Sequence, residues 1–298
     1  MLDYPNGSGD RELTLADDLK KLERNVYSQN GEDGVIEWVF SRIAPRHRIC
    51  VEFGAWDGRN LSNTFNLVAH HGWKAIHIEA DPHKFQTLKK TATAYPAITP
   101  VCSLVAAAGE LSLDRILERQ GVPEDFDLLS IDIDGNDYDV WEATVRFHPT
   151  LVVIEYNATI PPEFDYIDRG GRGYIGSSAA SLGALASRKG YGLLGCTATN
   201  LFFLREPYFS ALGVKPQAVD EALDRQAVCY VFFNHAGEIV FSNSAVAGRL
   251  RGVTYAQPMK TWVRRALRMP TFYLLGEAHQ EAGAVLKFLR WIKSLVRS

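Results

Sequence analysis

Two carboxylates and two glycines lie close together in the segment Val51–Gly58, whose sequence is VEFGAWDG. Gly54 and Gly58 permit a sharp turn and let the backbone approach a ligand closely. Glu52 and Asp57 place negative charge at the mouth of that turn, where it repels phosphate groups and attracts ammonium and sulfonium groups. The segment therefore predicts a buried strand and a turn that binds a positively charged, nucleoside-type cofactor.

A second acid follows the next predicted strand. Glu79 and Ala80 end the apolar run from Lys74, roughly 20 residues beyond the first turn, where an acid accepts hydrogen bonds from ribose hydroxyls. Enzymes that bind NAD share this acid, but the first turn lacks the G-x-G-x-x-G pattern that holds a pyrophosphate. S-adenosylmethionine, which has no phosphate, is therefore the expected cofactor, with Asn63 and Thr64 included in its site. A nucleotide-dependent oxidoreductase stays a less favoured alternative.

Acidic and amide side chains end two further predicted strands. Asp132 and Asp134 follow the fourth strand, and Glu155 and Asn157 end the fifth. Adjacent parallel strands bring such ends together at one edge of a sheet. Their oxygen atoms suit a hard cation such as Mg²⁺, so these four residues form a candidate metal site. The alternatives that Asp132 and Asp134 cap the following helix or bind the ammonium group of the cofactor stay open.

Methyl transfer to a hydroxyl is assisted by a general base that takes the proton as the oxygen attacks. Asp134 and Glu155 are the candidates for this base. His148 precedes Pro149 and is expected to be a loop residue, and His77 lies inside a predicted strand and is expected in the core. A carboxylate is therefore preferred over histidine.

Apolar runs alternate with helical segments along most of the chain, which predicts an α/β fold. Helices are expected over 14–24, over 181–189 and over a segment before Pro45, with crossover helices such as 111–120. The helix before Pro45 carries Val35, Ile36, Val39, Phe40 and Ile43. A final pair of strands is expected to be antiparallel and to close the sheet edge. The arrangement is that of the Rossmann-like class I methyltransferases: a mostly parallel seven-stranded sheet, an antiparallel terminal strand and helices on both faces. The predicted strands are 49–53, 75–79, 99–105, 126–132, 151–156, 191–196 and 200–204.

The composition indicates an ordinary globular protein, with 298 residues, 46% hydrophobic and 22% charged. The four cysteines are widely spaced and suggest neither a metal site nor a disulfide framework. No apolar run reaches the ~18 residues that a membrane span needs, so a cytoplasmic protein is expected. We divide the chain into N-terminal helices and lid over 1–45, a catalytic domain over 46–206 and an extension over 207–298.

The C-terminal extension is basic. Residues 249–298 contain ten Lys and Arg against two Glu, whereas the whole chain has a formal charge of −3, which gives no indication of nucleic-acid binding. A hairpin is expected over 228–242 and an amphipathic helix over 284–296. This helix either docks on its own domain or contacts the inner face of a membrane peripherally. A non-catalytic scaffold protein recruited through this tail is the main alternative to an enzyme, and a homo-oligomer stays open.

Several motifs in one order resemble the FkbM-like S-adenosylmethionine-dependent methyltransferases. The likeness covers about residues 27 to 205, and linked motifs are more specific than any single one. The segments that carry it are YSQNGED over 27–33, EFGAWDG over 52–58, IEADP over 78–82, SIDIDGND over 130–137, IEYN over 154–157, YIGSS over 174–178 and KGYGLLGC over 189–196.

The resemblance implies roles for residues in these motifs. Glu52, Gly54, Asp57 and Gly58 would hold the methionine part of the cofactor. Glu79 would bind the ribose, Asp132 would lie near the amino-acid end, and a lid would be formed by Tyr27, Gln29 and Glu32. The implied acceptor is a hydroxyl of a saccharide, glycolipid or glycosylated natural product. Related sugar methyltransferases use Mg²⁺ bound by acids at the fourth and fifth strand ends, but Tyr156 follows Glu155 where a second acid would stand.

Overall fold

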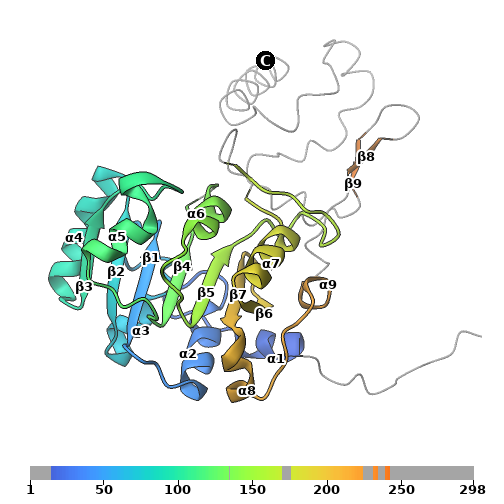
Figure 1. The fold of residues 1–298 in the computed structure, drawn as a ribbon, viewed down its shortest axis with the longest axis horizontal. Coiled ribbons are helices and arrows are strands. Elements are labelled where there is room, and N and C mark those ends of the chain that lie inside the picture. Colours follow the sequence, from blue (N-terminus) through green and yellow to red (C-terminus); the bar gives the residue numbers. More distant parts are fainter. Residues whose placement is uncertain (1–14, 134, 170–175, 224–230, 234–238, 242–298) are drawn as a thin grey trace, which may run out of the picture. The chain divides into compact units, whose positions relative to one another are not determined.

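The computed structural model describes residues 15–133, 135–169, 176–223, 231–233 and 239–241 (Figure 1). Two compact units share the chain: the first takes 1–157, 162–169 and 175–223, and the second takes the rest. The helices predicted over 1–45 thus fall in the same unit as the sheet. All elements up to α9 belong to the first unit.

Seven strands of the first unit form one sheet in the order β3-β2-β1-β4-β5-β7-β6. The first five are parallel, and β7 runs antiparallel between β5 and β6. This confirms the predicted class of fold. The strands are β1 Ile49–Phe53, β2 Lys74–Glu79, β3 Ile98–Cys102, β4 Leu128–Ile131, β5 Leu151–Glu155, β6 Tyr191–Cys196 and β7 Asn200–Arg205.

Helices cover both faces of this sheet. Apolar residues of the first two helices and of the helix after β1 pack with Cys50 and Val153 in one core cluster. On the other face, Trp141 is 1% exposed and its ring lies 5.3 Å from that of Phe203. The helices are α1 Leu15–Leu22, α2 Glu32–Arg42, α3 Phe65–His71, α4 Pro82–Ala94, α5 Leu113–Arg119, α6 Asp137–Ala143, α7 Ala179–Arg188, α8 Phe209–Leu212 and α9 Val219–Ala222, with 3-10 turns at Gly109–Leu111 and Glu206–Tyr208.

The strand order reverses between β1 and β4. The chain moves outward from β1 to β3, then returns to place β4 on the other side of β1. In open parallel sheets, the crevice beyond the carboxyl ends of the two strands at such a reversal is the usual ligand site. The turns after β1 and β4 therefore form its two sides.

Predicted and observed bounds differ at the ends of several strands. The fourth strand was expected from Phe126 but begins at Leu128, because the buried Asp127 accepts hydrogen bonds from the amides of Arg46, His47 and Ile49. Asp127 thereby fixes the chain that enters β1. The third strand was expected to reach 105 but ends at Cys102.

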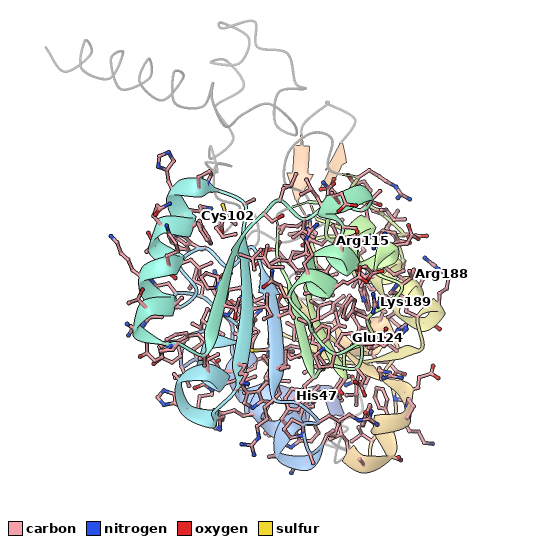
Figure 2. All side chains as sticks on the ribbon, turned by 60° about the vertical axis from the view of Figure 1, so that its left-hand side comes forward. His47, Cys102, Arg115, Glu124, Arg188 and Lys189 are labelled. Atoms are coloured by element: carbon pink, nitrogen blue, oxygen red, sulfur yellow. The ribbon has the colours of Figure 1, made fainter. Side chains whose placement is uncertain are left out.

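Outer charged residues form surface ion pairs. Arg188 of α7 pairs with Glu142 at 3.3 Å, and Arg146 pairs with Glu118 and Glu124 at 2.5 and 2.9 Å. Figure 2 shows Arg188 at the right-hand edge of the molecule, with Glu124 and Arg115 of α5 in the same half of the view. Such exposed pairs contribute about 0–1 kcal/mol each. The acids at the carboxyl edge of the sheet have very different surroundings.

The second unit contains one described hairpin. Strand β8, Val231–Phe233, pairs antiparallel with β9, Ile239–Phe241, which confirms the predicted hairpin. The predicted helix over 284–296 lies outside the described residues. Within those residues, no helix is both long and apolar enough to cross a membrane.

Candidate methyl-donor site

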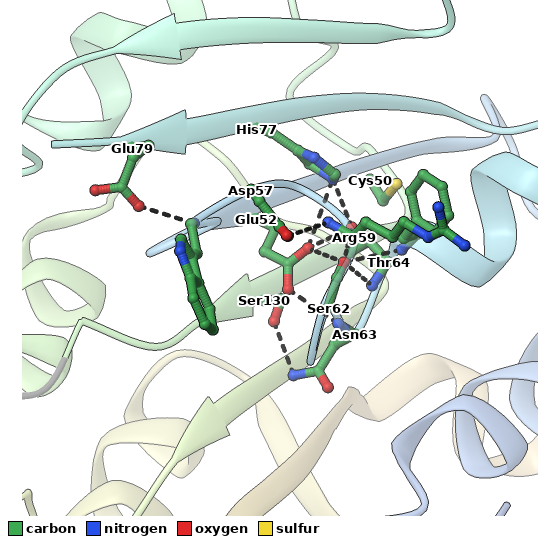
Figure 3. A network of polar contacts seen from close by, with 12 residues as sticks. Cys50, Glu52, Asp57, Arg59, Ser62, Asn63, Thr64, His77, Glu79 and Ser130 are labelled. Atoms are coloured by element: carbon green, nitrogen blue, oxygen red, sulfur yellow. Dashed lines mark hydrogen bonds and ion pairs between the residues drawn. The ribbon is translucent and has the colours of Figure 1, made fainter. Parts of the chain in front are cut away.

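A row of polar residues crosses the three central strands of the sheet. Glu52 of β1 lies opposite His77 of β2 on one side and Ser130 of β4 on the other. All three are buried, with exposures of 6%, 0% and 0%. The row lies one residue before the end of β1, and Figure 3 shows Glu52, His77 and Ser130 within one polar network.

The loop before α3 supplies hydrogen-bond donors to the buried Glu52 carboxylate. The Ser62 and Thr64 hydroxyls donate to Oε2 at 2.5 and 2.6 Å, and the Asn63 amide donates to Oε1 at 2.9 Å. The Asn63 side chain then donates to Ser130 Oγ at 3.1 Å. A buried carboxylate needs such partners, since an unpaired one would cost several kcal/mol. Glu52 therefore fixes the loop that closes the turn.

His77 extends this network in its neutral form. Because the Thr64 hydroxyl donates to Glu52, its oxygen is left to accept from His77 Nε2, which lies 2.8 Å away. His77 Nδ1 is buried without a partner, which suits an unprotonated nitrogen. Burial lowers the pKa of His77, against the opposing effect of Glu52 and Asp57. The 3.5 Å contact between His77 and Glu52 is therefore not an ion pair at neutral pH.

The turn after β1 is compact and lies against β4. Gly54 has a φ of 78°, and a Cβ there would lie 1.7 Å from the carbonyl oxygen of Asp132. Gly58 has a φ of 73°, and a Cβ there would lie 2.8 Å from His77 Nδ1. Only glycine fits both positions. The Asp57 carboxylate accepts from the amides of Arg59 and Asn60 at 2.9 and 2.8 Å, which orders the loop beyond the turn.

Glu79 ends β2 beside this turn. It is 5% exposed and accepts hydrogen bonds from the amides of Trp56 at 2.8 Å and Asp81 at 2.7 Å. Each carboxylate oxygen has a second lone pair for a further donor such as a ribose hydroxyl. Ala80, the next residue, is exposed. The structure thus brings Glu79 and Ala80 next to the glycine turn.

The acids after β4 divide into two kinds. Asp137, in the first turn of α6, is 3% exposed and accepts from the amides of Ile133 and Gly135, both at 2.9 Å. These two hydrogen bonds hold the loop between β4 and α6 in place. Asp132 is exposed just after β4, and its amide donates to the Phe53 carbonyl at 3.3 Å. Asp134 lies outside the described residues.

Glu155 and Asn157 end β5 and are both half-buried. Glu155 pairs in register with Asn200 of β7, and the amide of Asn157 donates to the Ser177 carbonyl at 3.0 Å. Among the described residues, no group of three or more His, Cys, Asp and Glu is arranged to hold a metal ion. The described residues therefore do not build the predicted metal site by themselves.

The segment before α2 is held by its own two acids. Asp33 is 1% exposed and accepts from the amides of Val26, Tyr27 and Ser28 at 2.7 to 2.8 Å. Glu32 is fully buried and accepts from three groups, the Asn30 amide, the Thr197 hydroxyl and the Asn200 side chain, at 2.6 to 3.0 Å. Glu32 was predicted to contact the cofactor as part of the lid. The structure shows a positioning role, because the Glu32 carboxylate ties this segment to Thr197 and to Asn200 of β7. Its contact with the cofactor stays a prediction.

Residues 106–175 match the family model of the methyltransferase FkbM domain. This match identifies an FkbM-like methyltransferase domain. The matched residues include β4, α6, β5 and the strand-end residues Asp132, Glu155 and Asn157. The resemblance inferred from the sequence motifs is therefore confirmed over this segment, whereas the glycine turn after β1 lies outside it.

Three of the solved structures that match this chain are the following. The CMeT domain of the citrinin polyketide synthase matches with 13% identity and a TM-score of 0.41, over 58% of this chain and 51% of its own. The N-terminal domain of EvdMO1 with SAH bound matches with 13% identity and a TM-score of 0.40, over 60% and 81%. A SAM dependent methyltransferase from Aquifex aeolicus matches with 10% identity and a TM-score of 0.40, over 64% and 98%.

The chain thus spans about half the length of the citrinin synthase domain. Comparison with curated proteins gives no match. The assignment of the fold therefore rests on the chain's own strand order. The assignment of S-adenosylmethionine as the cofactor rests on the segment that matches the FkbM model.

The predicted lid residues differ in their exposure. Tyr27 is half-buried and Gln29 is exposed. The ring of Tyr27 packs on Phe65 at 4.7 Å, and the Arg59 guanidinium lies 5.7 Å from its centroid, which joins the predicted lid to the turn loop. By contrast, Glu52, Asn63 and Thr64 contact one another in the interior. Direct contacts with the cofactor stay a prediction for all of them.

Sequence reasoning missed Ser62, Thr197 and Asn200, which donate to Glu52 and Glu32. It also missed Ser130, which accepts from the Asn63 side chain. Ser130 had a usable signal, since it stands two residues before Asp132 in a buried strand. Ser62 and Thr197 lie in polar loops and Asn200 begins β7, and no spacing indicates a partner 10 to 168 residues away.

We expect the His77→Gln variant to lose part of the acid sensitivity of folding. Below about pH 6.5, the unfolded histidine binds a proton that the buried His77 does not, so stability falls as the pH is lowered towards the folded pKa. Glutamine still donates to Thr64 but does not titrate. Urea unfolding at pH 5 to 7 should show a slope shallower than wild type by up to about 1.4 kcal/mol per pH unit.

The matched control is His148→Gln, which removes an exposed histidine. Parallel stability profiles for wild type and His77→Gln would contradict a neutral, buried His77.

Proposed function

We propose that this chain transfers the methyl group of S-adenosylmethionine to a hydroxyl of a saccharide, glycolipid or glycosylated natural product. One observation carries the proposal: in an FkbM-like domain, the glycine turn, Glu79 and Asp132 meet at the reversal of strand order. A cytoplasmic location and a peripheral membrane contact through the helix predicted over 284–296 are further parts of the proposal.

The chemistry of the crevice fits S-adenosylmethionine. Glu79 offers carboxylate oxygens for ribose hydroxyls at the end of β2. Asp57 and Asp132 add negative charge on the β1 and β4 sides, which attracts the ammonium and sulfonium groups of the cofactor. Neither turn offers the glycine-rich helix start that phosphate groups require.

The proposed acceptor site lies beyond β5. The chain that follows carries Phe164 and Tyr166, which are 58% and 39% exposed. Tyr166 is anchored, since its amide donates to Ser178 Oγ at 3.0 Å and its carbonyl accepts from the Ser178 amide at 2.8 Å. Exposed aromatic faces near carboxylates suit sugar rings, which supports a saccharide acceptor.

Glu155 is the proposed general base. The acceptor oxygen attacks the methyl carbon in line with the carbon–sulfur bond, which breaks and leaves a neutral thioether. As the new carbon–oxygen bond forms, the hydroxyl proton passes to the Glu155 carboxylate. Asp134, the other base predicted from the sequence, lies outside the described residues.

The first test is binding of S-adenosylhomocysteine, measured by calorimetry. Wild type should bind, and Glu79→Gln should bind at least about tenfold more weakly because a charged acceptor of the ribose is lost. Asp81→Asn is the matched control: Asp81 is exposed and caps α4, so its affinity should stay within about twofold of wild type. A folded wild type that binds nothing at millimolar ligand would sink the proposal.

Glu155→Gln tests the chemical step. With labelled S-adenosylmethionine and a panel of glycosides, transfer should fall about 10²-fold or more while S-adenosylhomocysteine affinity stays unchanged. Glu206→Gln, an exposed acid just after β7, is the control and should keep full transfer. A scaffold protein without catalysis, the main alternative, predicts no transfer by wild type on any acceptor.

Mg²⁺ assistance is a separate hypothesis, and no step above depends on it. Asp132, Glu155 and Asn157 are its described candidates, and Asp134 would have to complete the ligand set. If a metal takes part, EDTA abolishes methyl transfer and added Mg²⁺ restores it. Equal turnover with and without EDTA rejects the metal.

A further inference from the structure

Three non-glycine residues in the described part of the chain have a left-handed backbone: Arg48, Trp56 and Leu61. For a bulky aromatic residue this conformation is a true outlier. Trp56 has a φ of 48°. The Gly58 amide donates to the Ala55 carbonyl at 2.6 Å, so Trp56 occupies the second position of a four-residue turn. Turns with a positive φ at this position normally use glycine there.

Burial of the Trp56 side chain does not offset this backbone strain. Trp56 is 46% exposed, whereas Trp73 and Trp141 are 3% and 1% exposed. A large apolar side chain that is both strained and exposed contributes little to folding, and strained residues cluster at ligand sites.

The surroundings of Trp56 connect it to the nucleoside side of the crevice. The Trp56 amide donates to Glu79 Oε2 at 2.8 Å. Trp56 is thus held against the acid that is proposed to bind the ribose. Lys84 Nζ, in the first turn of α4, lies 6.0 Å from the ring centroid. The indole thus lies within reach of the Lys84 ammonium group.

We propose that Trp56 is a cofactor-contacting residue whose indole packs on the adenosine part of S-adenosylmethionine. This inference rests on the proposed function and adds to it an apolar wall beside the acid that binds the ribose. An aromatic face contributes stacking and apolar contact with a base, which a carboxylate does not. The strained backbone of Trp56 is then explained by the need to place its ring near Glu79.

A trade-off between stability and binding follows. Trp56→Gly relieves the strained φ and should leave the melting temperature unchanged or higher, because the lost side chain was largely exposed. The same variant should bind S-adenosylhomocysteine at least about tenfold more weakly. A purely structural tryptophan predicts the opposite pair: a lower melting temperature and unchanged affinity.

Arg48→Gly is the matched control. Arg48 has a φ of 54° and lies just before β1, at the opposite end of that strand. Its melting temperature should respond as that of Trp56→Gly does, with S-adenosylhomocysteine affinity within about twofold of wild type.

Trp56→Phe gives a readout that does not depend on stability. It keeps an aromatic ring, so it should still bind, but S-adenosylhomocysteine should quench tryptophan fluorescence in wild type and not in this variant. Equal quenching in both, or wild-type affinity for Trp56→Gly, would overturn the inference while leaving the proposed function intact. No binding by wild type would overturn both.

Discussion

The burial of one carboxylate, Glu52, constrains the whole candidate site. A buried acid in the middle of a sheet is tolerated only if donors reach it. The neighbouring strands supply only Ser130 and His77 at that row, so the donors come from Ser62, Asn63 and Thr64. The loop between β1 and α3 must therefore fold back over its own strand. That return path creates the turn from Gly54 to Gly58 and determines where its backbone lies against β4.

The Asp and Glu side chains at the carboxyl edge of the sheet thus have two different roles. Glu32, Asp33, Glu52 and Asp137 are nearly or fully buried, and their hydrogen bonds hold the chain segments that frame the crevice. Asp57, Asp132 and Glu155 are at least partly accessible at its mouth. Glu79 combines both roles, because it is 5% exposed yet stands at a strand end and holds Trp56. A cofactor is therefore expected to contact the second group, while the first determines where that group stands.

The fold could be predicted from the sequence because the patterns that indicate strands and crossover helices are local. Ile49–Phe53 and Tyr191–Cys196 were predicted with their observed bounds, and the buried position of His77 followed from its place inside an apolar strand. The roles of individual acids could not be separated in the same way. Whether Glu32 faces a ligand or the interior depends on Thr197 and Asn200, 165 and 168 residues away, and no local pattern contains that information. The backbone strain of Trp56 is equally invisible in the letters EFGAWDG.

Electrostatics explains why the buried acids still matter to ligand choice. Carboxylates that are hydrogen-bonded within the protein keep their negative field, which low-dielectric walls transmit into a crevice. Glu52 lies directly beneath the turn, and its neighbour His77 is held neutral by burial, so it contributes no compensating positive charge. Arg59 and Lys84 are exposed and lie over aromatic rings, Arg59 over Tyr27 and Lys84 over Trp56. The interior of the crevice is thus acidic and its cations are peripheral, an arrangement that disfavours pyrophosphate and attracts a sulfonium. In the proposed reaction, methyl transfer removes the sulfonium charge, so the attraction between this field and the cofactor should weaken, which favours release of the product.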